Sequence, residues 1–178
     1  MHPNDQTASS ASPRSRHVPA LALMAFVGAA VALPGAAAAA QYRDEIRNDM
    51  HRCAAGSGPA VLVTVDGVKS SSGKVRVQSY RATSSDWLQK GRWLSRIEVP
   101  ARAGSMTFCV PVSGPGNYAI AIRHDVNGNG GTDFMSDGGG MSNNPSINIF
   151  NLGKPAVGKT AFAVGNDVKA IRIRMRYL

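Results

Sequence analysis

The residue types best suited to chemistry gather in one glycine-rich turn, His124-Asp125-Val126-Asn127-Gly128-Asn129-Gly130-Gly131-Thr132-Asp133. The turn follows an apolar run of strand length, and its oxygen-bearing side chains recur at about every second position. Calcium requires about six to eight oxygen ligands on a chain that bends sharply. If Asp125 is the first position of an EF-hand-type loop, the predicted calcium ligands are Asp125, Asn127, Asn129, Gly131 through its carbonyl, and Asp133.

The loop departs from an EF-hand at the twelfth position, where Ser136 stands in place of a bidentate glutamate. Asp137 follows by one residue and completes the predicted ligand set if the loop is looser. So few carboxylates predict a weak affinity for calcium, with a Kd of roughly 10⁻⁴ to 10⁻³ M. The residues on either side of the loop are typical of strands and not of the helices of an EF-hand. Asp, Asn and Gly also form turns without an ion, so a purely structural turn and another cation remain open alternatives.

Catalytic groups are sparse beyond residue 40, where His51 and His124 are the only histidines. A triad of His124 and Asp125 with Ser136 or Ser142 is conceivable, but no Gly-x-Ser-x-Gly turn presents a nucleophile. We therefore expect a non-enzymatic structural or interaction module.

The C-terminal residues 168–177 form a strand pattern with one apolar and one cationic face. The whole chain carries a net charge of +9. An anionic ligand could meet four cations at this end, Lys169, Arg172, Arg174 and Arg176. Anionic cell-envelope polysaccharide or lipid suits this face better than nucleic acid, because export and an aromatic content of 6% argue against the latter. The alternative is a solvated strand face that discourages self-pairing.

Residues 1–40 are predicted to be a secretory signal peptide, cleaved just before Gln41. Arg14 and Arg16 precede an apolar run that ends in small residues. A transmembrane anchor is the competing interpretation, but prolines interrupt the run and it is short for a span. We therefore expect a periplasmic or secreted protein that does not span the membrane after the signal is removed.

Two cysteines, Cys53 and Cys109, suit an oxidising compartment. A disulfide between them would close a loop of about 55 residues, worth roughly 4 kcal/mol in the chain-entropy model. Two free buried thiols or a metal pair are the alternatives, although the spacing matches no zinc pattern.

The chain after residue 40 divides into a charged segment at 41–58 and an all-β domain at 59–178. Apolar residues at helical spacing predict a short helix or turn over 41–52, ending at Cys53. Alternating and β-branched runs predict strands at 60–65, 73–80, 93–99, 105–112, 118–123, 147–150, 160–164 and 168–177. About seven to eight such strands separated by turns are typical of an antiparallel β-sandwich.

Five segments of the sequence carry a family resemblance: Val61 to Asp66, Gly73 to Val77, Gly116 to Ile120, His124 to Gly130, and Ser142-Asn143-Asn144. Together they resemble the secreted bacterial family called domain of unknown function 2141. The most specific part runs from Tyr118 to Asp133, and the resemblance extends from about Pro59 to Tyr177. It implies an immunoglobulin-like or prealbumin-like sandwich outside the cytoplasm and no known activity.

Overall fold

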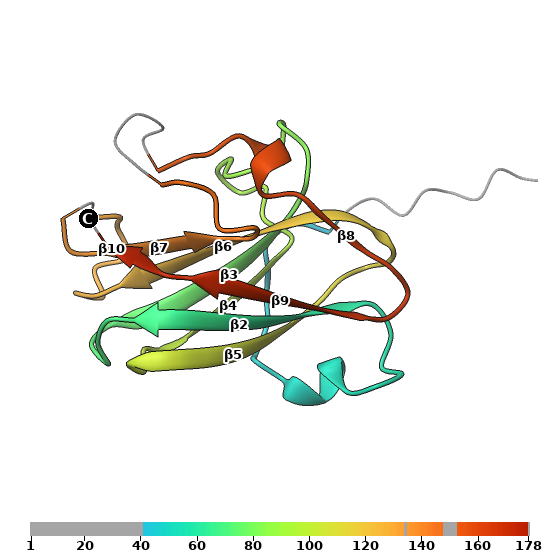
Figure 1. Cartoon of the computed structure of the whole chain (residues 1–178), viewed down its shortest axis with the longest axis horizontal. Helices are drawn as coiled ribbons and strands as arrows, with labels where there is room; N and C mark the ends of the chain where they lie inside the picture. Colours follow the sequence, from blue (N-terminus) through green and yellow to red (C-terminus); the bar gives the residue numbers. More distant parts are fainter. Residues whose placement is uncertain (1–40, 134, 148–152, 178) are drawn as a thin grey trace, which may run out of the picture. The chain divides into compact units, whose positions relative to one another are not determined.

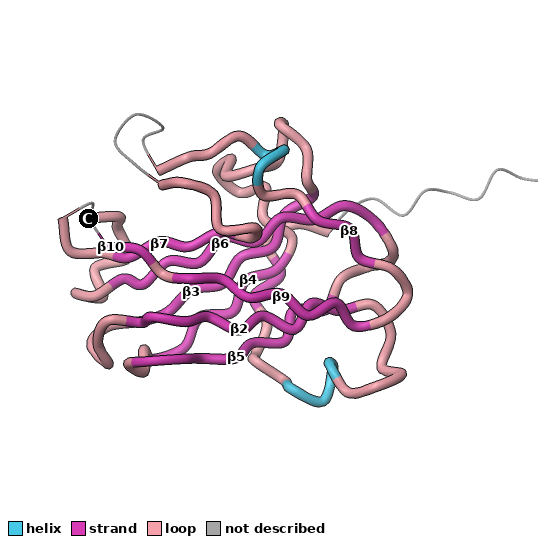
Figure 2. The backbone as a smooth tube through the Cα atoms, viewed as in Figure 1, coloured by secondary structure: helices cyan, strands magenta, loops and turns pink. Residues whose placement is uncertain are grey.

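The computed structural model describes residues 41–133, 135–147 and 153–177, and the structural statements below concern these residues. They contain ten strands and only short 3-10 helices (Figure 2). The predicted signal peptide lies outside the described residues. No helix in the described ranges is both long and apolar enough to cross a membrane.

The strands form two sheets that face each other (Figure 1). The larger sheet has the order β1-β4-β3-β6-β7-β10, with β8 also paired to β6, and the smaller has the order β5-β2-β9. The bounds are β1 Asp44–Glu45, β2 Ala60–Val68, β3 Lys74–Arg81, β4 Ser95–Pro100, β5 Gly104–Pro111, β6 Gly116–Asp125, β7 Gly138–Met141, β8 Phe162–Val164, β9 Val168–Arg174 and β10 Arg176–Tyr177. The predicted all-β sandwich is thus confirmed.

Alternation along the strands creates the core between the sheets. In β2, the side chains of Val61, Val63 and Val65 are completely buried, while those of Leu62 and Thr64 between them are partly exposed. The same core contains side chains from six other strands, including Val75, Val77, Ile97, Phe108, Val110, Ile120, Ile122, Val164 and Ile173. Because side chains alternate with a period of two, the apolar pattern determines which face of each strand is buried.

A second apolar cluster covers the opposite face of the larger sheet. It contains Tyr80, Trp87, Trp93, Ala119 and Met141. Trp87 lies in the connection between β3 and β4, and its ring meets that of Tyr80 edge-on at a centroid distance of 5.3 Å. The Trp87 Nε1–H donates to the Pro155 carbonyl at 2.8 Å, so one side chain joins two loops to the sheet.

The sheets are mixed, not wholly antiparallel as predicted. β2 pairs with β9 in parallel from Ala60↔Val168 to Asp66↔Arg174, and β1 pairs with β4 in parallel. The short helix predicted over 41–52 is not confirmed. The backbone N–H groups of Arg43, Asp44 and Ile46 donate instead to carbonyls of residues 93–96, at the start of β4. One 3-10 turn, η1, remains at Met50–Cys53.

A glycine-rich segment outside the predicted strands, Gly138–Met141, forms strand β7. It pairs with β6 on one side and with β10 on the other. A Cβ atom at Gly138 would collide with the Tyr177 ring, and one at Gly140 would lie 2.8 Å from the Ile173 side chain. Glycine is therefore needed here because the side chains of Tyr177 and Ile173 lie directly against the β7 backbone. The strand predicted at 147–150 falls mostly outside the described residues.

Candidate functional site

The Asp125 loop, residues 125–137, is the connection of a β-hairpin. β6 and β7 pair as far as His124↔Gly138, so the loop leaves one strand and returns to its neighbour. This geometry places the predicted ligands at one end of the larger sheet. It also confirms that the flanks are strands and not the helices of an EF-hand.

Side-chain oxygens fold the Asp125 loop by accepting hydrogen bonds from its backbone. Asp125 Oδ2 accepts the Gly130 N–H at 2.8 Å, and Asn127 Oδ1 accepts the Asn129 N–H at 3.1 Å. Asn129 Oδ1 accepts the Gly131 N–H at 2.7 Å. Gly130 has a φ of 78°, a left-handed conformation that glycine adopts without a steric penalty. The chain bends sharply at the position where the EF-hand register predicts it.

The two remaining carboxylates close the Asp125 loop. Asp137 accepts the Val126 N–H at 3.1 Å and the Asp133 N–H at 3.0 Å. Asp133 Oδ2 in turn accepts the Nδ2 groups of Asn127 at 2.7 Å and Asn129 at 2.8 Å. All six predicted ligand residues therefore join one network, with Gly131 taking part through its N–H.

One oxygen of this network has no partner. Asp125 is 4% exposed, and its Oδ1 is buried without any hydrogen bond. A buried polar atom left unpaired typically costs about 1–3 kcal/mol, and more when it is charged. Among the described residues, no three His, Cys, Asp or Glu side chains converge as a metal cage. Any cation at Asp125 would therefore complete its shell with amide and backbone oxygens.

Arg123 already places a cation in the Asp125 loop. Its Nη1 donates to Thr132 Oγ1 at 2.9 Å, and its Nη2 donates to the Gly130 carbonyl at 2.9 Å and lies 3.4 Å from Asp125 Oδ2. Burial lowers the pKa of Arg123, and Arg76, its direct partner on β3, lowers it further, while Asp125 acts in the opposite direction. Sequence reasoning missed Arg123. The available signal was its spacing of two from Asp125, which puts both on one strand face.

His124 is completely buried beside the loop. Its Nδ1 lies 2.7 Å from the Tyr177 hydroxyl, and its Nε2 lies 2.8 Å from the Ser72 carbonyl. Because the Ser72 carbonyl can only accept, the ring proton lies on Nε2 and donates to it, so Nδ1 accepts the Tyr177 hydroxyl proton. The Tyr177 oxygen in turn accepts the Lys69 N–H. Burial raises the pKa of Tyr177. His124 thus joins β6 to the end of the chain.

Of the two serines considered for a triad, Ser142 is engaged elsewhere. The Ser142 hydroxyl donates to the Thr160 carbonyl at 2.6 Å and accepts the Ile120 N–H. Neither Ser142 nor Ser136 is hydrogen-bonded to His124, whose two ring nitrogens are both occupied. These residues do not assemble into a hydrogen-bonded triad.

The predicted basic face divides into separate parts. Lys169 pairs with the core residue Val61 of β2. It therefore lies on the same face of β9 as Ile171, whereas the arginines of β9 lie on the other face. Arg172 donates to Asp66 at 2.7 Å, and this bond, with one from Ser105, lowers the pKa of Asp66. Arg174 and Arg176 are exposed and form no ion pair among the described residues, but Arg174 ends β9 while Arg176 belongs to the other sheet.

Two asparagines that sequence reasoning did not identify as caps occupy the free edges of the smaller sheet. Asn48 donates to the Thr107 carbonyl at 2.9 Å and accepts the Cys109 N–H at 2.9 Å on β5. Asn144 does the same on β9, with the Arg172 carbonyl at 3.0 Å and the Arg174 N–H at 2.7 Å. Each amide takes the place of a neighbouring strand, which blunts an edge that would otherwise pair with another chain.

The predicted disulfide is confirmed. Cys53 and Cys109 are bonded, with their Cα atoms 5.7 Å apart, and join the end of η1 to β5. The bridge and Asn48 fasten the same short segment to the same strand.

Comparison with known proteins finds one family. The family described as "Uncharacterized protein conserved in bacteria (DUF2141)" matches residues 63–172. No curated protein and no solved structure matches the chain.

Proposed function

The chain belongs to the bacterial family of domain of unknown function 2141, and from that premise we propose that it is an exported, non-enzymatic β-sandwich module whose Asp125 loop binds calcium. The leader-like pattern of residues 1–40 and the disulfide support export, because disulfides persist in oxidising compartments. The geometry of the Asp125 loop supports calcium binding. Its bound ion would brace the glycine-rich surface between β6 and β7.

The buried, unpartnered Asp125 Oδ1 carries this proposal. A calcium ion there would neutralise the carboxylate and supply the missing partner. The amide oxygens of Asn127 and Asn129 each accept one N–H and retain a second lone pair for a cation. The Gly130 N–H bond to Asp125 already holds the first ligand toward the loop.

Arg123 makes the affinity weak. Its guanidinium contacts the Gly130 carbonyl and lies near Asp125, so a divalent ion must approach a positive charge or displace it. This repulsion agrees with an affinity of roughly 10⁻⁴ to 10⁻³ M. Calcium at about ten to a hundred times its Kd would stabilise the fold by about 1.4 to 2.7 kcal/mol.

The first prediction is that calcium raises the Tm of the purified protein by about 3 to 10 °C under those conditions. Asp125→Asn should abolish the increase, because the neutral amide lacks the second anionic oxygen. Asp167→Asn is the matched control, since Asp167 is an exposed turn residue outside the loop. Thermal melts with and without calcium, with magnesium as the comparison ion, provide the measurement. If the Tm of the wild-type protein is the same with and without calcium, the calcium proposal is wrong.

Arg123→Gln provides the opposite change in the same experiment. Glutamine removes the competing charge and the donor to the Gly130 carbonyl, so the calcium affinity should increase by about tenfold. A lower affinity than wild type would show that Arg123 helps to hold the ion-binding geometry.

A second candidate function is the binding of anionic cell-envelope polysaccharide or lipid. The exposure of Arg172, Arg174 and Arg176, the last two without ion pairs among the described residues, favours it. The second prediction is that the purified protein binds vesicles of phosphatidylglycerol mixed with phosphatidylcholine, with an affinity that falls as salt rises.

A triple change of these arginines to serine should weaken vesicle binding at least tenfold. The charge-matched control changes three cations exposed elsewhere, Arg47, Arg52 and Lys90, to serine. If both triple variants lose the same affinity, only the net charge matters and the arginine face is not a binding site.

A further inference from the structure

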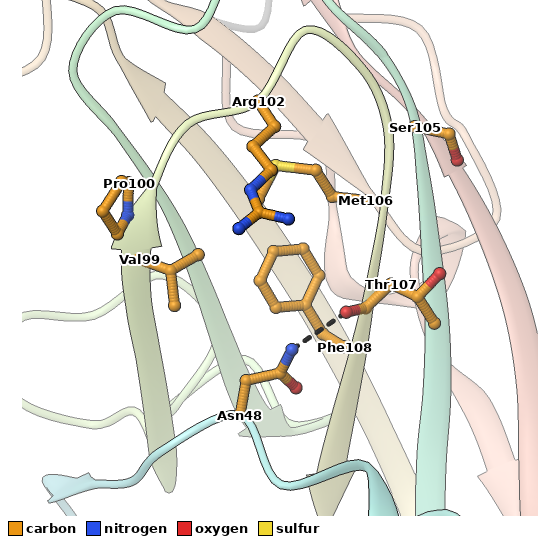
Figure 3. A pocket seen from close by; sticks show the side chains of 8 residues that line it. All are labelled: Asn48, Val99, Pro100, Arg102, Ser105, Met106, Thr107 and Phe108. Atoms are coloured by element: carbon orange, nitrogen blue, oxygen red, sulfur yellow. Dashed lines mark hydrogen bonds between the residues drawn. The ribbon is translucent and has the colours of Figure 1, made fainter.

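A groove lies at the open edge of the sandwich, where the chain passes from one sheet to the other. Its frame has four sides: the end of β4, the connection at residues 101–103, the start of β5, and Asn48 of the N-terminal segment (Figure 3). The groove has a volume of about 460 Å³, within the range of roughly 300–1,000 Å³ usual for small-molecule sites.

The floor of the groove is apolar. Phe108 lies at its base and is completely buried, while Val99 and Met106 are half-buried on either side. Pro100 adds a further apolar wall and has no backbone N–H to offer. Asn48, Arg102, Ser105 and Thr107 add polar groups, so a ligand would meet polar and apolar surface in about equal measure.

Arg102 gives the groove its charge. Its side chain extends from the 101–103 connection toward the Phe108 ring (Figure 3). It forms no ion pair or side-chain hydrogen bond among the described residues, in contrast to Arg76, Arg92, Arg96, Arg123 and Arg172, which each contact a carboxylate. No Asp or Glu lines the groove. An unpaired guanidinium beside an apolar floor is complementary to an anion that carries an apolar chain.

The wall formed by Asn48 makes an added β-strand a poor occupant. The Asn48 amide already occupies the Thr107 carbonyl and the Cys109 N–H on the outer edge of β5. The disulfide at Cys53 and Cys109 fastens the segment that carries it. A peptide strand would have to displace this amide to pair with β5, whereas a small ligand lying between the sheets would not.

We propose that this groove binds an amphiphilic organic anion, an alkyl chain ending in a carboxylate, with the carboxylate on Arg102 and the chain against Val99, Pro100 and Met106. The site is separate from the Asp125 loop in both residues and chemistry. The groove proposal therefore does not depend on calcium binding, and the two are tested separately.

The third prediction concerns dodecanoate, below its micellar concentration, added to the purified protein. In methyl-resolved NMR spectra, the Val99 and Met106 signals should shift in a saturable way, while methyl signals on the opposite face of the larger sheet, such as Met141, stay unchanged. Dodecanol, which has the same chain without the charge, should bind at least tenfold more weakly, because it loses the charge-assisted bond to Arg102.

Arg102→Gln should reduce the affinity for dodecanoate by about tenfold and leave that for dodecanol unchanged. The matched control is Lys90→Gln, an exposed cation in the connection between β3 and β4, outside both the groove and the arginine face. Both residues lie on the surface, so both variants should retain the wild-type Tm. The proposal fails if the Val99 and Met106 signals do not respond to dodecanoate. It also fails if dodecanol binds equally well, or if the two variants lose affinity alike.

Discussion

Replacing Cys53 and Cys109 together by alanine is expected to lower the free energy of unfolding by about 4 kcal/mol. The disulfide joins residues 56 positions apart, so its loss releases a long loop in the unfolded chain. In the folded state, it also frees the segment that carries Asn48, whose amide caps β5. Urea denaturation of wild type and the double variant, monitored by circular dichroism, measures the difference.

Reduction of the wild-type protein provides the control for this prediction. It removes the same bond without deleting the buried sulfur of Cys109, so the two losses should agree to within the small cost of the cavity left by alanine. A loss below about 1 kcal/mol in both experiments would show that the loop is restrained by other contacts, and that the chain-entropy account does not apply.

Trp87→Ala should destabilise the protein by about 3–5 kcal/mol. Trp87 is 6% exposed and packs against Tyr80 in the cluster that covers the outer face of the larger sheet. Its removal leaves a cavity and deprives the Pro155 carbonyl of its donor. The measurement is again urea denaturation, together with proteolysis of the two loops that the side chain joins.

Trp87→Phe separates packing from hydrogen bonding. Phenylalanine keeps an aromatic ring against Tyr80 but lacks the Nε1–H, so we expect a smaller loss, about 1–2 kcal/mol. If Trp87→Ala and Trp87→Phe are equally destabilised, the hydrogen bond to Pro155 and not the ring is the main contribution. If neither is destabilised, this cluster does not contribute to the fold.

Much of the fold follows from local patterns. Strand β2 is a β-branched run, and β3 alternates apolar and polar residues, so their existence and buried faces are predictable from a period of two. The turn of the Asp125 loop is equally local, since the side chains of Asp125, Asn127 and Asn129 each accept a backbone N–H two to five residues away. The disulfide was predictable because the chain holds only two cysteines.

The missed features depend on distant residues. The glycines of β7 show no strand pattern in the sequence. Only the folded structure shows that the side chains of Tyr177 and Ile173 lie against them. The parallel pairing of β9 with β2 joins residues more than a hundred positions apart. Asn48 and Asn144 are ordinary loop residues in sequence, and only the tertiary structure places them at the edges of the smaller sheet.

Arg123 was missed for a different reason. It ends the apolar run that precedes the loop, and its position in the sequence alone does not show that its side chain contacts the loop. The strand register places it on the same side as Asp125 and directly opposite Arg76. A cation within the loop changes the expected chemistry, because a calcium ion must now compete with a side chain for the same oxygens.

The most direct test of the calcium proposal is a crystal structure of the protein grown with calcium. The proposal predicts a single strong density peak in the Asp125 loop, about 2.3–2.6 Å from Asp125 Oδ1, with amide or carbonyl oxygens completing its shell and Arg123 drawn away from Asp125. A loop without such a peak, in which Asp125 Oδ1 instead accepts a hydrogen bond from water or from Arg123, would contradict it.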